Sequence, residues 1–322
     1  MSESVNPVPS NSPSEDKRAA DAFVERLAFA ALVEQRRNRR WGIFFKSVFL
    51  LYLVVVLILA FSPLDPTATD RSQPHAALVN LEGLIASGMD ANAKDVISGL
   101  RSAFKNDSTT GVILSINSPG GSPVQAGEMY DEIMRLREAH PDTPIYAVAT
   151  DVCASGGYYV AAATQKIYAN KASIIGSIGV RTDGFGFVDA MSKLGITRRL
   201  YTSGESKGFL DPFQPPKPED VRHLESMLDE IHQQFIAAVR QGRGERLQET
   251  PELFSGLVWT GSKSLELGLI DELADVRFVA KEVIGTEKII DYTKRPKVLE
   301  RILSNVEATL TLLTSVFSPG VR

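Results

Sequence analysis

The sequence predicts an α/β fold, because two stretches each place a glycine-rich turn between a buried strand and a helix. In the first, the β-branched run 111–116 ends in the turn residues 117–121, and Ser122 caps the helix that follows. In the second, the apolar run 145–149 leads through residues 151–157 into a helix. Two such units in tandem favour a parallel sheet whose strands end at a shared edge.

Ser155 lies at the second of these strand-to-helix turns. A hydroxyl there is exposed at the carboxyl edge of the sheet, and the N–H groups that open the helix point to where an oxyanion would form. The small neighbours Ala154, Gly156 and Gly157 let a substrate backbone approach closely. This stretch alone is equally consistent with a glycine turn that only packs a helix on a sheet.

Composition excludes several classes of protein. The chain has 322 residues, enough for one large domain or two modest ones, and a net charge of −4 gives no sign of a nucleic-acid partner. Its single cysteine, Cys153, excludes an internal disulfide framework and a clustered cysteine metal site. Cys153 stands two residues from Ser155, but no histidine or lysine is aimed at it, so a small buried thiol is the better interpretation.

The amino-terminal third predicts a membrane anchor. Residues 1–40 form a tail that is disordered at its polar start and basic at its end, with four arginines in 36–40. Residues 41–61 are apolar except for Lys46, and about 20 helical residues cross a bilayer. The arginines predict a cytoplasmic amino terminus. A cleaved signal peptide is the alternative, but the apolar segment starts late and lacks a small-x-small site.

The remaining chain divides into a linker, a folded domain and a final helix. Residues 62–75 are rich in proline and small polar residues, residues 76–295 form the folded domain, and residues 296–322 form an amphipathic helix. Further elements follow from periodicity: an opening strand at 77–85, helices at 91–105 and 219–240, and strands at 166–169, 174–180 and 198–201.

A serine nucleophile needs a base, and histidine is weakly supported. No histidine lies between Ser155 and His223. His75 falls in the predicted linker and His140 in a polar loop, while His223 and His232 belong to a solvated helix face.

Lysine is the other candidate base, and the loop 202–213 offers Lys207 between small residues and the apolar Phe209, Leu210 and Phe213. An ordinary lysine amine has a pKa of about 10.4, and apolar burial favours the neutral form that a base requires. An exposed loop lysine without a catalytic role remains the alternative. Three other lysines compete, but they lie in strand or helix contexts with polar neighbours: Lys166, Lys171 and Lys193.

Five motifs in order give the chain a resemblance to the bacterial signal peptide peptidase A family. Any one of them is weak, since the first turn also looks like that of the Clp protease and of enoyl-CoA hydratases. Together they cover roughly residues 76–280, and the predicted anchor also fits. The motifs are Asn117-Ser118-Pro119-Gly120-Gly121, Ala154-Ser155-Gly156-Gly157-Tyr158-Tyr159, Gly176-Ser177-Ile178-Gly179-Val180, Ser203-Gly204-Glu205-Ser206-Lys207, and Trp259-Thr260-Gly261 with Leu267-Gly268-Leu269-Ile270-Asp271.

The resemblance implies a Clp/crotonase-like fold of repeated ββα units, preceded here by one transmembrane helix. It implies a serine–lysine dyad in which Ser155 is the nucleophile and Lys207 the general base. Gly121 and Gly156 would supply the oxyanion N–H groups, and Ser177 would orient the lysine amine. Such a site requires no metal and no cofactor. The short family form carries both dyad residues on one chain and forms a homo-oligomeric ring, in which neighbouring subunits complete the sites.

The expected function is therefore that of a serine endopeptidase anchored in the bacterial inner membrane through residues 41–61, with its catalytic domain in the periplasm or outside the cell. Its substrates would be cleaved signal peptides and other apolar peptides, bound as extended strands. Two alternatives stay open. A crotonase-like acyl-CoA hydratase or hydrolase would use the same glycine N–H pair on a thioester, and a catalytically silent membrane scaffold would only bind partners.

Overall fold

The computed structural model describes residues 13–61 and 70–294. The chain forms two compact units, residues 1–65 and 66–322. The predicted amphipathic helix at 296–322 lies outside the described residues, as does most of the predicted linker.

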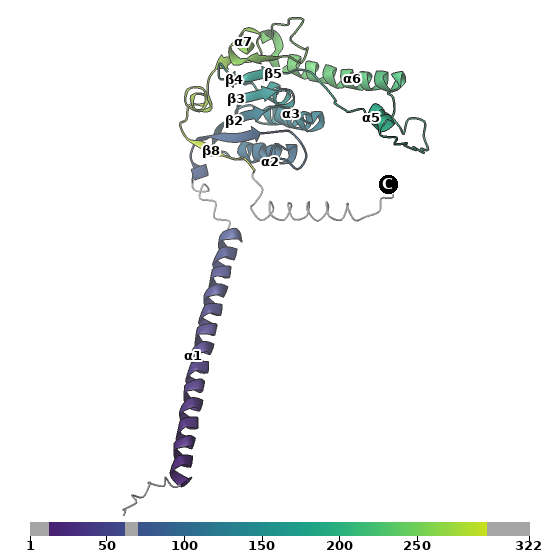
Figure 1. The fold of residues 1–322 in the computed structure, drawn as a ribbon. Helices are drawn as coiled ribbons and strands as arrows, with labels where there is room; N and C mark the ends of the chain where they lie inside the picture. Colours follow the sequence, from purple (N-terminus) through teal and green to yellow (C-terminus); the bar gives the residue numbers. More distant parts are fainter. Residues whose placement is uncertain (1–12, 62–69, 295–322) are drawn as a thin grey trace, which may run out of the picture. The chain divides into compact units, whose positions relative to one another are not determined.

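The first unit is built on one helix, α1 (Pro13–Phe61), drawn in purple in Figure 1. The helix runs without a break from residue 13 to residue 61, so the disorder predicted for the polar start of the tail, residues 1–18, is wrong for residues 13–18. Neither proline nor glycine interrupts residues 14–41, and alanine, glutamate, leucine and arginine are strong helix formers. In the described residues, no helix combines enough length and hydropathy to cross a membrane. The structure thus does not confirm the transmembrane helix predicted at 41–61.

A sheet forms the centre of the second unit, and its strands run parallel except for one edge pair. The order is β6-β5-β3-β2-β1-β8, with β4 pairing with β3 and β7, and among the described strands only β5–β6 is antiparallel. The predicted α/β fold with parallel strands is confirmed. The strands are β1 (His75–Glu82), β2 (Thr109–Ser118), β3 (Ile145–Ala154), β4 (Lys166–Ala169), β5 (Ile174–Gly176), β6 (Val258–Thr260), β7 (Glu272–Leu273) and β8 (Ile289–Asp291).

Helices follow the first three strands directly, and β4 and β5 then succeed each other without one. The predicted cap at Ser122 is confirmed, since its side chain accepts from the Gln125 N–H, and the side chain of Asn92 likewise accepts from the Asp95 N–H at the start of the helix at 93–104. The α-helices are α2 (Ala93–Phe104), α3 (Pro123–Ala139), α4 (Gly156–Ala162), α5 (Val188–Lys193), α6 (Pro218–Arg243), α7 (Gly261–Glu266) and α8 (Val276–Phe278). Shorter helical turns are η1 (Asp70–Ser72), η2 (Gly244–Arg246) and η3 (Val279–Ile284).

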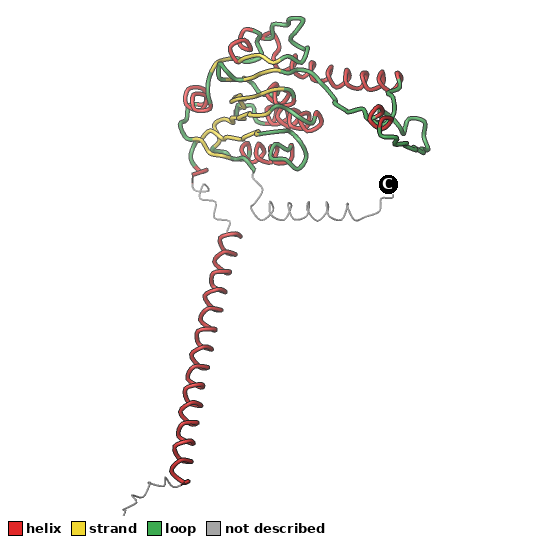
Figure 2. Tube along the Cα trace, in the orientation of Figure 1, coloured by secondary structure: helices red, strands yellow, loops and turns green. Residues whose placement is uncertain are grey.

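The two faces of the sheet carry separate cores, because alternate strand residues point to opposite faces. Val112 and Leu114 of β2 join the larger core under α2, α3, α4 and α6, whereas Ile113 between them joins the smaller core beside η3. The larger helices thus gather on one face of the sheet (Figure 2). The glycine turns lie at the carboxyl ends of β2 and β3.

Two local predictions are wrong. Residues 198–201 form no strand, although their pattern alternates; Arg198 instead forms an ion pair with Asp211 in the same loop. His75 is not a linker residue but the buried start of β1, where its ring stacks on Tyr292 at 5.8 Å and its Nε2 lies 2.9 Å from the tyrosine hydroxyl. Local sequence could not reveal this contact, because the two residues are 217 positions apart.

A buried carboxylate joins α2 to α3. Glu132 is 8% exposed and accepts hydrogen bonds from Arg101 at 2.8 Å and from Arg135 at 2.5 Å. Hydrogen bonds from Arg135 and Arg101 outweigh the opposing effect of burial and lower the pKa of Glu132 to about 2.

This carboxylate predicts a pH-dependent contribution to stability. A pKa below the unfolded value means that Glu132 stabilises the fold fully above about pH 4.3, and that this contribution is lost as the pH falls toward 2. We expect Glu132→Gln to lower the free energy of unfolding by about 1–2 kcal/mol at pH 7, since both arginines are largely exposed. Urea unfolding at pH 7, 4.5 and 3.5 measures the difference in unfolding free energy between the wild type and Glu132→Gln. The control is Glu128→Gln, because Glu128 is exposed on the same helix. A difference that does not shrink below pH 4 would contradict this account.

Candidate active site

Ser155 stands between the end of β3 and the start of α4 with a backbone that serine rarely adopts. Its φ is 50° and its ψ is −125°, a strained combination for a residue with a side chain. The Ser155 N–H donates to the Gly176 carbonyl oxygen at 2.8 Å, which ties the turn to the end of β5. A serine held this way at a strand-to-helix turn presents its hydroxyl at the sheet edge, as nucleophilic serines require.

The glycine turn after β2 lies directly against this serine. A Cβ added at Gly120, whose φ is +100°, would lie 2.6 Å from the Ser155 Cβ. Buried Ser118 fixes the turn, because its hydroxyl donates to the Gly83 carbonyl oxygen at 2.7 Å and accepts from the Gly120 N–H at 3.1 Å. Only glycine fits at position 120 without displacing the serine.

Two backbone N–H groups, those of Gly121 and Gly156, lie close to Ser155. The Gly121 nitrogen lies 3.3 Å from where a Cβ on Gly156 would stand, so the predicted oxyanion residues are neighbours. Within the described part of the chain, neither the Gly121 nor the Gly156 N–H donates to a protein acceptor. Gly121 is held from its other side, where Ile85 accepts from the Ser122 N–H at 2.8 Å. Unused donors at this point suit a developing negative charge.

Ser177 also reaches this edge. The register of β3 and β5 pairs Ala154 with Gly176, so the residues that follow them, Ser155 and Ser177, leave adjacent strand ends. Ser177 has a φ of 51°, and its N–H donates to the Leu257 carbonyl oxygen at 2.7 Å. Four of the five predicted site residues therefore gather at one edge of the sheet.

Lys207 does not join them within this single chain. It lies in the loop between α5 and α6 with an exposed side chain. Among the described residues, no hydrogen bond links it to Ser155 or Ser177. In Figure 1, α5 and the loop around it lie beside the far half of α6, away from the sheet strands.

Cys153 is fully buried, and burial raises the pKa of its thiol. A thiol that resists ionisation is a poor nucleophile, so the interpretation of Cys153 as packing is supported.

Sequence reasoning did not assign two residues that shape the site. The sequence marks Gly120 only as part of a glycine turn, although it gives Ser155 its space. Residues 77–85 predict one strand, whereas β1 ends at Glu82 and Ile85 forms a separate parallel bridge with Gly121. A glycine inside the run 77–85 predicts a bulge or turn, and Gly83 has a φ of +90° just after β1 ends.

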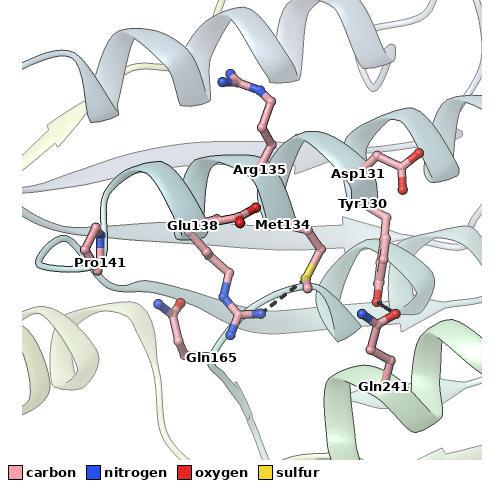
Figure 3. A pocket seen from close by; sticks show the side chains of 9 residues that line it. Tyr130, Asp131, Met134, Arg135, Glu138, Pro141, Gln165 and Gln241 are labelled. Carbon is pink, nitrogen blue, oxygen red and sulfur yellow. Dashed lines mark hydrogen bonds between the residues drawn. The ribbon is translucent and has the colours of Figure 1, made fainter.

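A hollow of about 710 Å³ lies elsewhere, along the carboxyl-terminal half of α3 and beside the end of α6 (Figure 3). Tyr130 donates to Gln241 across it at 3.3 Å. None of the predicted site residues lines it. The lining residues are Tyr130, Asp131, Met134, Arg135, Arg137, Glu138, Pro141, Gln165 and Gln241.

Comparison with known proteins decides the family. Residues 137–288, which include Ser155, Ser177 and Lys207, match the sequence profile of peptidase family S49. A putative protease of Synechocystis is 31% identical over 240 residues, which cover 73% of this chain and 84% of the relative. The chain belongs to peptidase family S49. The resemblance to signal peptide peptidase A is thereby confirmed.

Two further relatives share shorter parts with this S49 chain. A putative signal peptide peptidase SppA of Enterococcus faecium is 29% identical over 202 residues, 63% of this chain and 58% of the relative. A Brucella abortus protein named Na(+)/H(+) antiporter NhaA is 45% identical over 186 residues, 58% of this chain but 25% of that protein. Because most of the Brucella protein lies outside the match, its name assigns no transport function to this S49 chain.

The close packing of Gly120 on Ser155 gives a test of the site. We expect Gly120→Ala to slow covalent modification of Ser155 by a fluorophosphonate at least about 100-fold, because the added methyl displaces the serine. The matched control is Gly127→Ala in α3, where an added Cβ meets nothing within 4 Å; it should keep the rate and stabilise the helix by about 0.5–1 kcal/mol. Unchanged labelling of Gly120→Ala would show that the turn does not shape the site.

Proposed function

We propose that this chain is a serine endopeptidase in which Ser155 attacks the peptide carbonyl and Lys207 is the general base. The strained turn at Ser155 carries the proposal, because it presents the serine beside two unused N–H groups, those of Gly121 and Gly156. Membership of a peptidase family supports the same reaction.

In the proposed reaction, the neutral amine of Lys207 takes the proton of the Ser155 hydroxyl as its oxygen bonds to the carbonyl carbon. The carbonyl oxygen becomes an oxyanion that accepts from the Gly121 and Gly156 N–H groups. The lysine ammonium then protonates the leaving amine, and the peptide bond breaks to give an acyl-serine. Water, deprotonated by the same lysine, hydrolyses this ester and restores the serine. Ser177 would hold the amine in line.

Neighbouring copies of the chain would complete this site. Residues 185–213, which include Lys207, form an arm. It carries large exposed apolar side chains: Phe185 at 82% exposed, Leu194 at 73%, Ile196 at 54% and Tyr201 at 87%. Exposed apolar groups of this size favour burial in an interface. A homo-oligomeric ring would bury the arm and bring Lys207 to a serine, on the same or an adjacent subunit.

The proposed location is the bacterial inner membrane, with residues 41–61 as a single anchor, a cytoplasmic amino terminus and a periplasmic or extracellular catalytic domain. Among the described residues, α1 carries large exposed apolar side chains, including Phe45 at 63% and Leu51 at 63% exposed. A bilayer would cover them, and Arg36–Arg40 fit its cytoplasmic side. The substrates would be cleaved signal peptides and other apolar peptides near the membrane.

Hydrolysis of a fluorogenic apolar peptide tests the dyad. We expect Ser155→Ala and Lys207→Ala to lose at least about 10³-fold in kcat, while Lys193→Ala, an exposed lysine on the same arm, keeps the wild-type rate. Full activity of Lys207→Ala would mean that the base lies elsewhere. Thioester hydrolysis without peptidase activity would instead favour the acyl-CoA alternative.

Subunit mixing tests where the base comes from. If adjacent subunits share a site, mixed oligomers of Ser155→Ala and Lys207→Ala chains should regain up to about a quarter of wild-type activity, because some sites combine an intact serine with an intact lysine. Separately purified variants, mixed without subunit exchange, are the control. No recovery in verified mixed oligomers would assign both residues to one chain.

A further inference from the structure

An ion pair closes the loop that carries Lys207. Arg198 donates from Nη1 to both carboxylate oxygens of Asp211, although the loop lies outside the sheet. The Asp211 side chain is 6% exposed, whereas that of Arg198 is 34% exposed. The hydrogen bond from Arg198 outweighs burial and keeps the pKa of Asp211 below its ordinary value, so the pair stays charged at neutral pH.

Aromatic rings also contact this ion pair, through Arg198. The Arg198 guanidinium lies 5.0 Å from the centre of the Phe213 ring, and that ring stacks on Phe187 at 5.3 Å. The Phe187 N–H donates to the Pro212 carbonyl oxygen at 2.7 Å, and the Phe213 N–H donates to the Asp211 carboxylate at 3.1 Å. Backbone and side chains thus fix the base of the loop together.

Residues 203–210, between Arg198 and Asp211, form consecutive tight turns that set the position of Lys207. The Lys207 N–H donates to the Gly204 carbonyl oxygen at 3.2 Å, and the Asp211 N–H donates to that of Gly208 at 3.2 Å. Gly204 has a φ of +105°, and a Cβ there would lie 3.2 Å from the Lys207 Cγ, so the lysine stem folds back over it. The hydrogen-bonded turns therefore fix the position of the Lys207 backbone within the loop.

The core of the domain offers this loop little support. Helix α5, which precedes it, has no buried residue, and α6 meets it through the edge-on contact of Phe209 with His223 at 5.7 Å. A catalytic base must be held to within a fraction of an ångström. Within a single chain, contacts inside the loop itself therefore contribute much of its order.

We propose that Arg198 and Asp211, backed by Phe213, form a clamp that positions Lys207 for its role as base. This inference rests on the proposed function. Arg198 and Asp211 are positioning residues, because they act through the loop backbone and neither contacts Ser155.

Kinetics on the full chain test the clamp. We expect Arg198→Ala and the nearly isosteric Asp211→Asn each to lower kcat for a fluorogenic apolar peptide by about 10- to 100-fold with KM within about twofold of wild type. The double variant should be no slower than either single variant, because one interaction is lost in all three. The control is Arg199→Ala, an exposed arginine next in sequence, which should keep the wild-type kcat.

A second measurement asks whether the clamp acts through Lys207. In a Lys207→Ala background, adding Arg198→Ala should leave the residual rate of Ser155 labelling by a fluorophosphonate unchanged. A further loss there would overturn the proposal, because the pair would then support the fold in general. Wild-type kcat in Asp211→Asn with an inactive Lys207→Ala would overturn the clamp but leave the dyad intact. Full activity of Lys207→Ala would overturn the proposed function and the clamp with it.

Discussion

The Ser155 backbone, with φ 50° and ψ −125°, is the constraint on which the site depends. Such a conformation costs of order 1–3 kcal/mol and persists only where the surroundings enforce it. Here β5 enforces it through the hydrogen bond from the Ser155 N–H to Gly176, and the turn at Gly120 closes on the serine from the other side. The strained turn after β3 is thus held in place by the ends of its two neighbouring strands, β2 and β5.

The rest of the sheet stabilises these strand ends. Parallel pairing of β2 with β3 and of β3 with β5 sets their register, and the buried side chains under α3 and α4 fix the helices that begin at the turns. Because α4 starts directly after Ser155, its free N–H groups face the same edge. The proposed chemistry uses this arrangement, in which the sheet rather than a mobile loop holds the proposed nucleophile and oxyanion donors in place.

Much of this edge could be predicted from sequence, because its signals are local. The run 111–116, the glycine pair at 120–121 and the cap at Ser122 lie within a dozen residues, and the structure bears out the strand, turn and helix. In a parallel sheet, the carboxyl ends of neighbouring strands meet at one edge. This topology explains why four residues gather there: Gly121, Ser155, Gly156 and Ser177.

The remainder depends on contacts that local sequence does not encode. The alternation at 198–201 suggested a strand, but Arg198 binds Asp211 in a loop with no strand partner. His75 is buried through Tyr292 at the far end of the chain. Whether Lys207 meets Ser155 depends on contacts beyond a single chain if the ring forms, and no periodicity or spacing within the sequence can provide them.

The central claim is that Ser155 is an activated nucleophile. Its most direct test is to treat the full chain with a fluorophosphonate and to locate the adduct by peptide mass spectrometry. The account predicts one adduct, on Ser155, that forms far more slowly when the reagent meets a Lys207→Ala chain. An unmodified Ser155 in active protein, or an adduct on another serine that tracks the loss of activity, would contradict it.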